Sequence, residues 1–183
     1  MALIRLVLCL LSIGHTCLDG QVPSTWKSFT TVDKKISVLL PQTPKFLSKE
    51  ISSIWGTVTH ETHLYTESQE PLVGASYIIN RIKYPVGHID LDSTDLVIDL
   101  LKSTIESIQL SNGMGKVYEN ELNEGRFPGR NFRLANNDLG TTIKGRCFFG
   151  QSEIVVIMAY TSTSQSLMDQ IEWFFKSFRY LTD

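Results

Sequence analysis

Cysteine is scarce in this chain, and its placement excludes a disulfide-stabilised fold. Only three of the 183 residues are cysteines, and two of them, Cys9 and Cys17, fall within the first 20 residues. A disulfide scaffold needs more cysteines in a shorter chain. If the first 20 residues are a leader that is removed, Cys147 remains alone and cannot form an intramolecular disulfide. The apolar residues around Cys147 predict a buried, unreactive thiol.

The chain also has no large excess of positive or negative charge. Seventeen Lys and Arg stand against 19 Asp and Glu, a formal net charge of −2, and basic residues form no cluster along the chain. The sequence therefore does not predict binding to nucleic acid or to an anionic membrane surface. Hydrophobic residues make up 42% of the chain and charged residues 20%, which is typical of a globular domain and excludes a disordered chain.

No apolar run reaches the length of about 20 residues that a membrane-spanning helix needs. The longest, residues 6–13, follows Arg5 and precedes a more polar stretch ending at Gly20, a pattern typical of a secretory signal peptide. We therefore expect residues 1–20 to be a signal peptide, residues 21–183 to be one domain, and the protein to be secreted or periplasmic. A lipid anchor at Cys17 is the alternative, although His15 and Thr16 are unusual before an acylated cysteine. A buried N-terminal strand or helix is a further alternative.

The hydrophobic pattern of the remaining chain changes twice between strand and helix periodicity. Helical spacing of apolar residues predicts helices at 96–108 and after Thr163 or Ser164, each of which can cap the closing helix. Strands are predicted at residues 26–32, 36–40, 46–51, 55–66, 72–84, 117–122, 131–135, 141–149 and 154–161. This order predicts an α+β domain with a central antiparallel sheet of about seven strands and helices packed on its faces.

Two strands carry more specific expectations. Residues 154–159 are apolar on both faces, which predicts a central strand covered on each side. In the strand ending near Tyr84, Tyr77 and Ile79 share one face with Arg81. A charged side chain on that face predicts that this end of the sheet is partly solvated.

Residues His60 to His63 suggest a metal site on a strand. Side chains alternate along a strand, so Glu61 and His63 face the same side while His60 faces the other. Glu61 and His63 are therefore the candidate metal ligands, and a solvated strand face is the alternative. The spacing does not match the His-Glu-x-x-His pattern of helical zinc sites.

A glycine- and arginine-rich segment is the candidate binding site. Arg126, Arg130 and Arg133 fall within eight residues, and their guanidinium groups can bind a carboxylate or phosphate. Alternatively, the arginines pair with glutamates of the preceding strand, because Arg130 and Arg133 point to opposite faces of a strand. The possible partners are Glu119, Glu121 and Glu124.

The order of several short motifs resembles the PsbP-like superfamily, specifically its bacterial secreted members of unassigned function. The motifs are Trp26-x-x-Phe29, Leu39-Leu40-Pro41-x-x-Pro44, Tyr84-Pro85, residues 125–130 (GRFPGR), residues 146–150 (RCFFG) and residues 174–179 (FFKSFR). The resemblance implies a central antiparallel sheet between helices, an α/β/α sandwich, and binding to partners or small ions in place of a defined reaction. It provides no metal ligands that match this chain residue by residue.

Three functions remain open. The first is an exported, non-catalytic module that binds a protein or a component of the cell envelope. The second is a protein that binds a small anion or a metal, through the arginines or through Glu61 and His63. The third is an enzyme with a dispersed site, for which Cys147 and His63 are the candidates. The sequence contains no Gly-x-Ser-x-Gly motif or phosphate-binding loop, and it predicts no cofactor.

Overall fold

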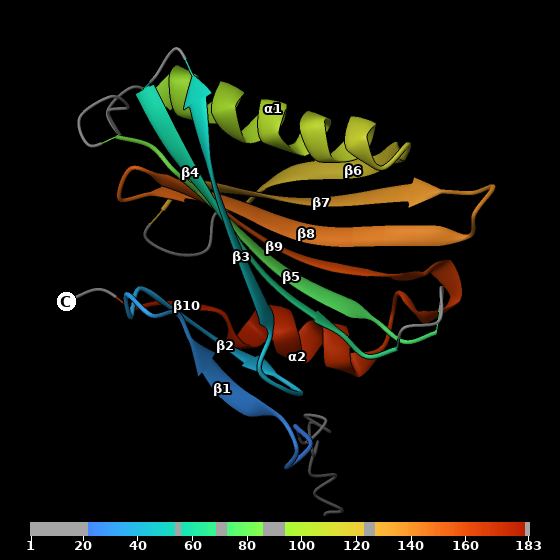
Figure 1. Ribbon diagram of the computed structural model, residues 1–183. Coiled ribbons are helices and arrows are strands. Elements are labelled where there is room, and N and C mark those ends of the chain that lie inside the picture. Colours follow the sequence, from blue (N-terminus) through green and yellow to red (C-terminus); the bar gives the residue numbers. More distant parts are fainter. Residues whose placement is uncertain (1–21, 54–55, 69–72, 86–93, 123–126, 182–183) are drawn as a thin grey trace, which may run out of the picture.

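The structure is a computed structural model that describes residues 22–53, 56–68, 73–85, 94–122 and 127–181. A strongly twisted sheet crosses the molecule, with α1 on one side of it and α2 and a small second sheet on the other (Figure 1). The strands are β1 (Lys27–Thr30), β2 (Ile36–Leu40), β3 (Lys45–Ser53), β4 (Gly56–Thr66), β5 (Ser76–Lys83), β6 (Gly115–Leu122), β7 (Gly129–Asn136), β8 (Thr141–Gly150), β9 (Glu153–Ser162) and β10 (Arg179–Tyr180). The α-helices are α1 (Thr94–Ser111) and α2 (Asp169–Ser177), and a 3₁₀ turn, η1, spans Thr163–Gln165.

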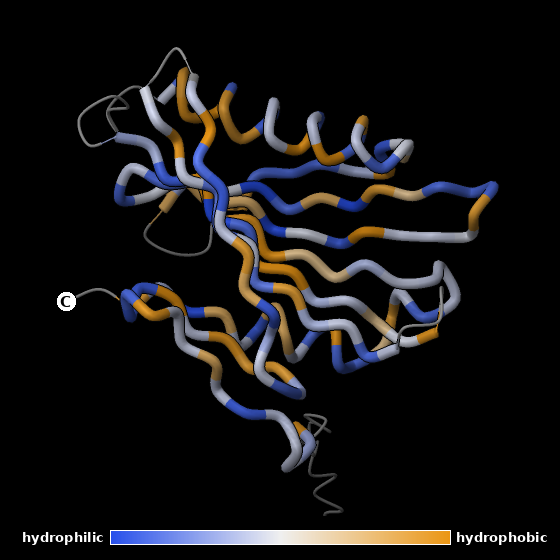
Figure 2. Tube along the Cα trace, viewed as in Figure 1, coloured by the Kyte–Doolittle hydropathy of each residue, from blue (hydrophilic) through white to orange (hydrophobic). Residues whose placement is uncertain are grey.

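The large sheet has seven strands in the order β3-β4-β5-β9-β8-β7-β6, and every neighbouring pair is antiparallel. This confirms the predicted α+β class and the central antiparallel sheet. β9 lies at the centre of the strand order, and its residues from Glu153 to Ala159 are all buried. The prediction of a central strand covered on both faces is therefore confirmed. Figure 2 shows hydrophobic residues concentrated along the central strands and polar residues along the edge strand β6.

The helix α1 covers the face of the sheet that we call the α1 face. Val97, Leu101 and Ile105 are its buried residues, and they pack against apolar side chains of β7, β8 and β9. This confirms the helix predicted from the spacing of apolar residues. Within the described part of the chain, no helix is both long and apolar enough to cross a membrane.

The opposite face, the α2 face, is covered by α2 and by the small sheet β1-β2-β10. The first two predicted strands do form an antiparallel hairpin, but β2 pairs with β10, and neither strand pairs with the large sheet. The alternating burial of β2 explains this, because its buried side chains, such as Val38, join the same core cluster as Phe174 of α2. The small sheet thus covers one part of the α2 face.

The closing helix begins later than the sequence predicted. Thr163 and Ser164 belong to the 3₁₀ turn, and α2 starts at Asp169, so neither residue caps that helix. The hydroxyl of Ser166 donates a hydrogen bond to the carbonyl of Thr163 at 2.8 Å, which stabilises the turn before the helix can begin. As a result Leu167, which the predicted helix would have included, lies before α2 and is 78% exposed.

Candidate functional site

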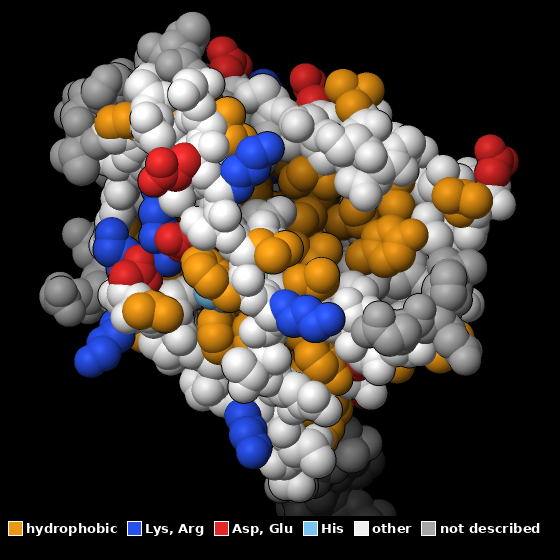
Figure 3. All heavy atoms as spheres, in the orientation of Figure 1, with side chains coloured by type: hydrophobic (Ala, Val, Ile, Leu, Met, Phe, Trp, Pro, Cys, Tyr) orange, Lys and Arg blue, Asp and Glu red, His pale blue; other side chains and the backbone are white. Residues whose placement is uncertain are grey.

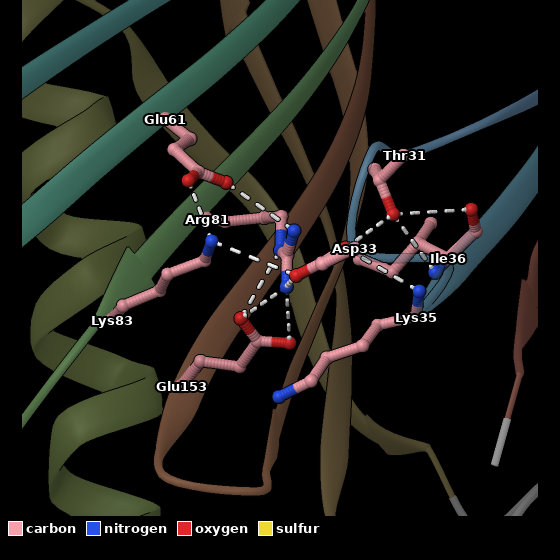
Figure 4. Close-up of polar contacts among 8 residues, drawn as sticks. All are labelled: Thr31, Asp33, Lys35, Ile36, Glu61, Arg81, Lys83 and Glu153. Carbon is pink, nitrogen blue, oxygen red and sulfur yellow. Dashed lines mark hydrogen bonds and ion pairs between the residues drawn. The ribbon is translucent and has the colours of Figure 1, made fainter. Parts of the chain in front are cut away.

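A charged cluster lies between the small sheet and the α2 face of the large sheet, with Arg81 of β5 at its centre (Figure 4). The Arg81 side chain is only 1% exposed. Its guanidinium donates to Glu153 of β9 through Nε at 3.1 Å and through Nη2 at 2.8 Å. It also donates to Asp33, in the turn between β1 and β2, at 2.7 Å and to Glu61 of β4 at 3.2 Å.

The expectation of a partly solvated face at Arg81 was therefore wrong. The hairpin β1–β2 places Asp33 over Arg81, and the carboxylates of β4 and β9 complete the enclosure. Sequence periodicity places a charge on a face but does not show which distant segment covers it. The sequence did contain one signal, the position of Arg81 on the same strand face as Tyr77 and Ile79. If such an arginine is buried, it must be paired with acidic groups.

Each of the three carboxylates in this cluster is paired with a cationic side chain. Lys83 contacts both Glu61 and Asp33, so each of these carboxylates binds two cationic groups. Burial alone would raise the pKa of Asp33, but hydrogen bonds from Arg81 and Thr31 hold it well below its usual range. Burial raises the pKa of Glu153, and Arg81 opposes that rise. The cluster connects the two sheets through ion pairs that span four segments of the chain.

The candidate metal ligands Glu61 and His63 line a cavity of about 220 Å³ beside this cluster. The His63 ring lies between those of Phe29 and Phe46, with centroid distances of 5.0 and 4.9 Å. Burial lowers the pKa of His63, while Glu61 already accepts hydrogen bonds from two cationic side chains. Among the residues that the structure describes, no three His, Cys, Asp or Glu side chains are grouped so as to hold a metal ion.

The candidate arginines do not converge. Arg130 lies on the α1 face and pairs with Glu119 of β6, which also binds Lys116. One of the glutamate pairings proposed from the sequence is therefore confirmed. Arg133 lies on the α2 face, as the alternation along β7 predicted. Arg126 lies outside the described residues.

Arg133 instead has basic neighbours that the sequence analysis did not consider. It stands directly opposite Lys144 of β8, and Arg146 of β8 stands opposite Asn131. Both β8 residues follow Arg133 by more than ten positions, and only the antiparallel register brings them beside it. We call Asn131, Arg133, Lys144 and Arg146 the basic patch.

The candidate nucleophile Cys147 is fully buried, as predicted. Its thiol packs in the core beneath α1. Burial strongly raises the pKa of this thiol, and the carboxylate of Glu119 adds to the effect. The thiolate that nucleophilic attack requires is therefore disfavoured.

The edge strand β3 and the groove beside it form an open surface that is partly apolar. Every residue of β3 from Lys45 to Ser52 is exposed, and Leu47 is 64% and Ile51 38% exposed. A groove of about 320 Å³ runs from Ile51 and His60 to Thr104 of α1. Figure 3 shows a hollow between α1 and β3 whose floor is hydrophobic, with Lys or Arg side chains at its rim.

Comparison with known proteins supports the assignment of the fold but does not assign a function. No protein-family model and no curated protein sequence matches this chain. The solution structure of cyanobacterial PsbP (CyanoP) from Synechocystis sp. PCC 6803 superposes with a TM-score of 0.53 at 11% sequence identity. The match covers 88% of this chain and 96% of that one. The chain therefore has a PsbP-like fold, as the short motifs of its sequence implied.

Proposed function

We propose that this protein is an exported, non-catalytic module that binds an extended segment of a partner protein along β3 and in the adjoining groove. The observation that carries the proposal is the exposure of β3 from Lys45 to Ser52 beside an apolar groove. An open edge strand presents backbone N–H and C=O groups that another strand can pair with. The side chains of the neighbouring groove can then select which sequence binds.

The side chains on the α1 face of β3 define the chemistry of the partner. Lys45, Leu47, Lys49 and Ile51 alternate between basic and apolar on this face. His60 of β4 stands directly opposite Lys49 and adds a titratable imidazole to the groove. A partner strand that alternates acidic and apolar residues would match both features. Lys45 and Lys49 also disfavour pairing between two copies of β3, because charged side chains on an edge strand oppose edge-to-edge association.

A non-catalytic role is supported by the burial of the two residues that were candidates for catalysis. Cys147 is fully buried and His63 is 5% exposed between two phenylalanine rings. Export rests on the signal-like sequence of residues 1–20, with a partner in the periplasm, the cell envelope or outside the cell. A lipid anchor at Cys17 would keep the same module at the envelope.

The test is a selection of random peptides, about as long as the nine residues of β3, on the purified protein. Selected peptides are expected to alternate acidic and apolar residues. Leu47→Lys should weaken their binding, measured by fluorescence anisotropy, by about tenfold or more. Lys49→Glu should weaken acidic peptides and favour versions in which the acidic residues are replaced by lysine.

The matched control is Val117→Lys on β6, the other edge strand, where Val117 is 55% exposed. This variant introduces the same charge at a similar exposure and should bind the peptides like the wild type. Failure of the selection to enrich such peptides would refute the proposal, as would equal binding by Leu47→Lys and the wild type.

A further inference from the structure

Three basic side chains gather on the α2 face of β7 and β8. Arg133 of β7 is directly opposite Lys144 of β8, and Arg146 lies two residues further along β8 on the same face. Residues directly opposite each other on neighbouring strands have Cβ atoms only about 5 Å apart, so like charges there repel each other. A fold that tolerates this arrangement requires either compensating acidic groups or another source of negative charge.

Acidic compensation in the described chain is slight. Within the described ranges, Lys144 pairs with one carboxylate, that of Glu172 of α2, at 3.5 Å, and the Glu172 side chain is 47% exposed. The Arg146 guanidinium lies 5.4 Å from the centroid of the Phe175 ring and forms no ion pair with any described carboxylate. Arg133 likewise pairs with no described carboxylate and makes only a long contact, 3.4 Å, with the hydroxyl of Ser166. The patch therefore keeps an excess of about two positive charges.

Three polar groups on this face of β7 and β8 lack hydrogen-bond partners in the described part of the chain. Among the described residues, the buried Nε of Arg133 has no hydrogen-bond acceptor and the buried Oδ1 of Asn131 has no donor. Thr142, on the same face two residues before Lys144, is 0% exposed and its hydroxyl is also unpaired. Buried groups of this kind are normally satisfied, and three on one face indicate that a polar ligand completes the site.

We infer that the basic patch binds a phosphate group. A phosphate dianion matches the excess charge, and its oxygens accept hydrogen bonds from the planar guanidinium groups of Arg133 and Arg146. Lys144 contributes a third positive charge, and rotation of the Asn131 amide presents its NH₂ group as a further donor. A single carboxylate would leave one positive charge uncompensated. This site is independent of the groove beside β3, which lies on the opposite face of the sheet.

The first test compares thermal unfolding in sodium phosphate and in sodium chloride at equal ionic strength and mildly alkaline pH, where phosphate is a dianion. Phosphate should raise the unfolding midpoint of the wild type, and chloride should not. Arg133→Gln and Arg146→Gln should lose this response. Without phosphate, Arg133→Gln should unfold at the same temperature as the wild type or higher, because like-charge repulsion is relieved. A purely structural arginine would give the opposite result.

The control is Lys102→Gln, an exposed charge removal on α1 that should leave the phosphate response unchanged. Vesicles containing phosphatidic acid, compared with vesicles of phosphatidylcholine alone, separate a lipid headgroup from free phosphate as the source of the ligand. Response to inorganic phosphate, to phosphatidic acid vesicles or to both, lost in Arg133→Gln, supports the site and identifies the source. No specific response to either phosphate probe, or a full response in Arg133→Gln, overturns it.

Discussion

Arg81 and Glu153 form a buried ion pair between two central strands, with 2.8 Å between Nη2 and Oε2 and side chains only 1% and 2% exposed. The same guanidinium reaches Asp33 in the hairpin of the small sheet. The pair thus does more than join β5 and β9, because Arg81 also adds a polar contact between the two sheets to the apolar core that they share. Removing one member leaves charged groups without partners inside the protein.

Replacing Arg81 by methionine tests this role. The variant leaves Glu153 buried without its main partner, so we expect the free energy of unfolding to fall by about 3–5 kcal/mol. Urea denaturation followed by circular dichroism measures the change. Lys102→Met, which removes an exposed cation from α1, should change stability by less than about 0.5 kcal/mol. If the two substitutions lowered the free energy of unfolding equally, the buried ion pair would contribute no more to stability than an exposed cation does.

The pH dependence of stability should contain a contribution from Asp33. Burial would raise the pKa of this group, but hydrogen bonds from Arg81 and Thr31 lower it in the folded chain. A lowered pKa stabilises the fold at all pH values above the unfolded pKa of about 4, and the stabilisation disappears as pH falls through the folded pKa. Asp33→Asn should therefore be less stable than the wild type at neutral pH.

The stability difference between the wild type and Asp33→Asn should stay constant down to about pH 4 and shrink below it. Urea denaturation at a series of pH values measures this. Asp99→Asn, at an exposed position of α1, should show no such pattern. A difference between the wild type and Asp33→Asn that grows on acidification would contradict the assignment.

Local periodicity was sufficient for much of the fold and for part of the site. The apolar run of β9 requires cover on both faces, and a central strand is the arrangement that provides it. Alternation along a strand likewise predicted that Arg130 and Arg133 face opposite sides. These properties depend on residues close together in sequence, where spacing determines direction.

The properties that could not be predicted depend on long-range pairing. Arg81 is buried because Asp33, 48 residues earlier, and Glu153, 72 residues later, meet around it. The basic patch exists because the register of β7 and β8 places Lys144 beside Arg133. The start of α2 depends on how the 3₁₀ turn packs, and a capping residue in the sequence does not reveal that. No local pattern encodes these pairings.

Binding of an acidic partner in the groove should depend on the protonation of His60. Burial and the nearby charge of Lys49 lower the pKa of His60 in the free protein. Lys49 is the charged neighbour on β3, while Ile82 of β5 and Thr104 of α1 add no charge to the groove. An acidic residue placed there favours the imidazolium, so the affinity for a selected acidic peptide should rise as pH falls through the pKa of His60.

Fluorescence anisotropy titrations at several pH values measure this dependence. His60→Gln should bind with nearly constant affinity over the same range, because glutamine does not titrate there. A peptide whose acidic residues are replaced by glutamine serves as the second control and should show a smaller pH effect. An unchanged pH profile in His60→Gln would exclude His60 as the group responsible.

The thiol of Cys147 should react only when the protein unfolds. It is completely buried, and burial raises its pKa, so the reactive thiolate is scarce and inaccessible in the native state. In a chain that begins at residue 21 and therefore lacks Cys9 and Cys17, labelling by a chromogenic disulfide reagent should be negligible in buffer and rapid in concentrated urea. Ser24→Cys, at an exposed position, should label at once under native conditions. Rapid native labelling of Cys147 would show that the core beneath α1 opens readily.

Glycine at position 145 is required by the aromatic ring that covers it. Gly145 of β8 stands directly opposite Phe132 of β7, and a Cβ added at Gly145 would overlap the fully buried Phe132 ring. The ring is held by the core, so Gly145→Ala should lower the free energy of unfolding by about 1–3 kcal/mol or more. Gly115→Ala is the matched control, since the nearest atom to its added Cβ is a carbonyl oxygen at 3.7 Å.

A double-mutant cycle shows whether the ring itself is the cause. Phe132→Leu alone should destabilise the protein by opening a cavity, but adding Gly145→Ala to it should cost less than in the wild type, because the smaller side chain leaves room for the methyl group. Urea denaturation of the four proteins gives the coupling free energy between the two positions. Strict additivity would mean that the penalty at Gly145 arises from its backbone and not from its contact with Phe132.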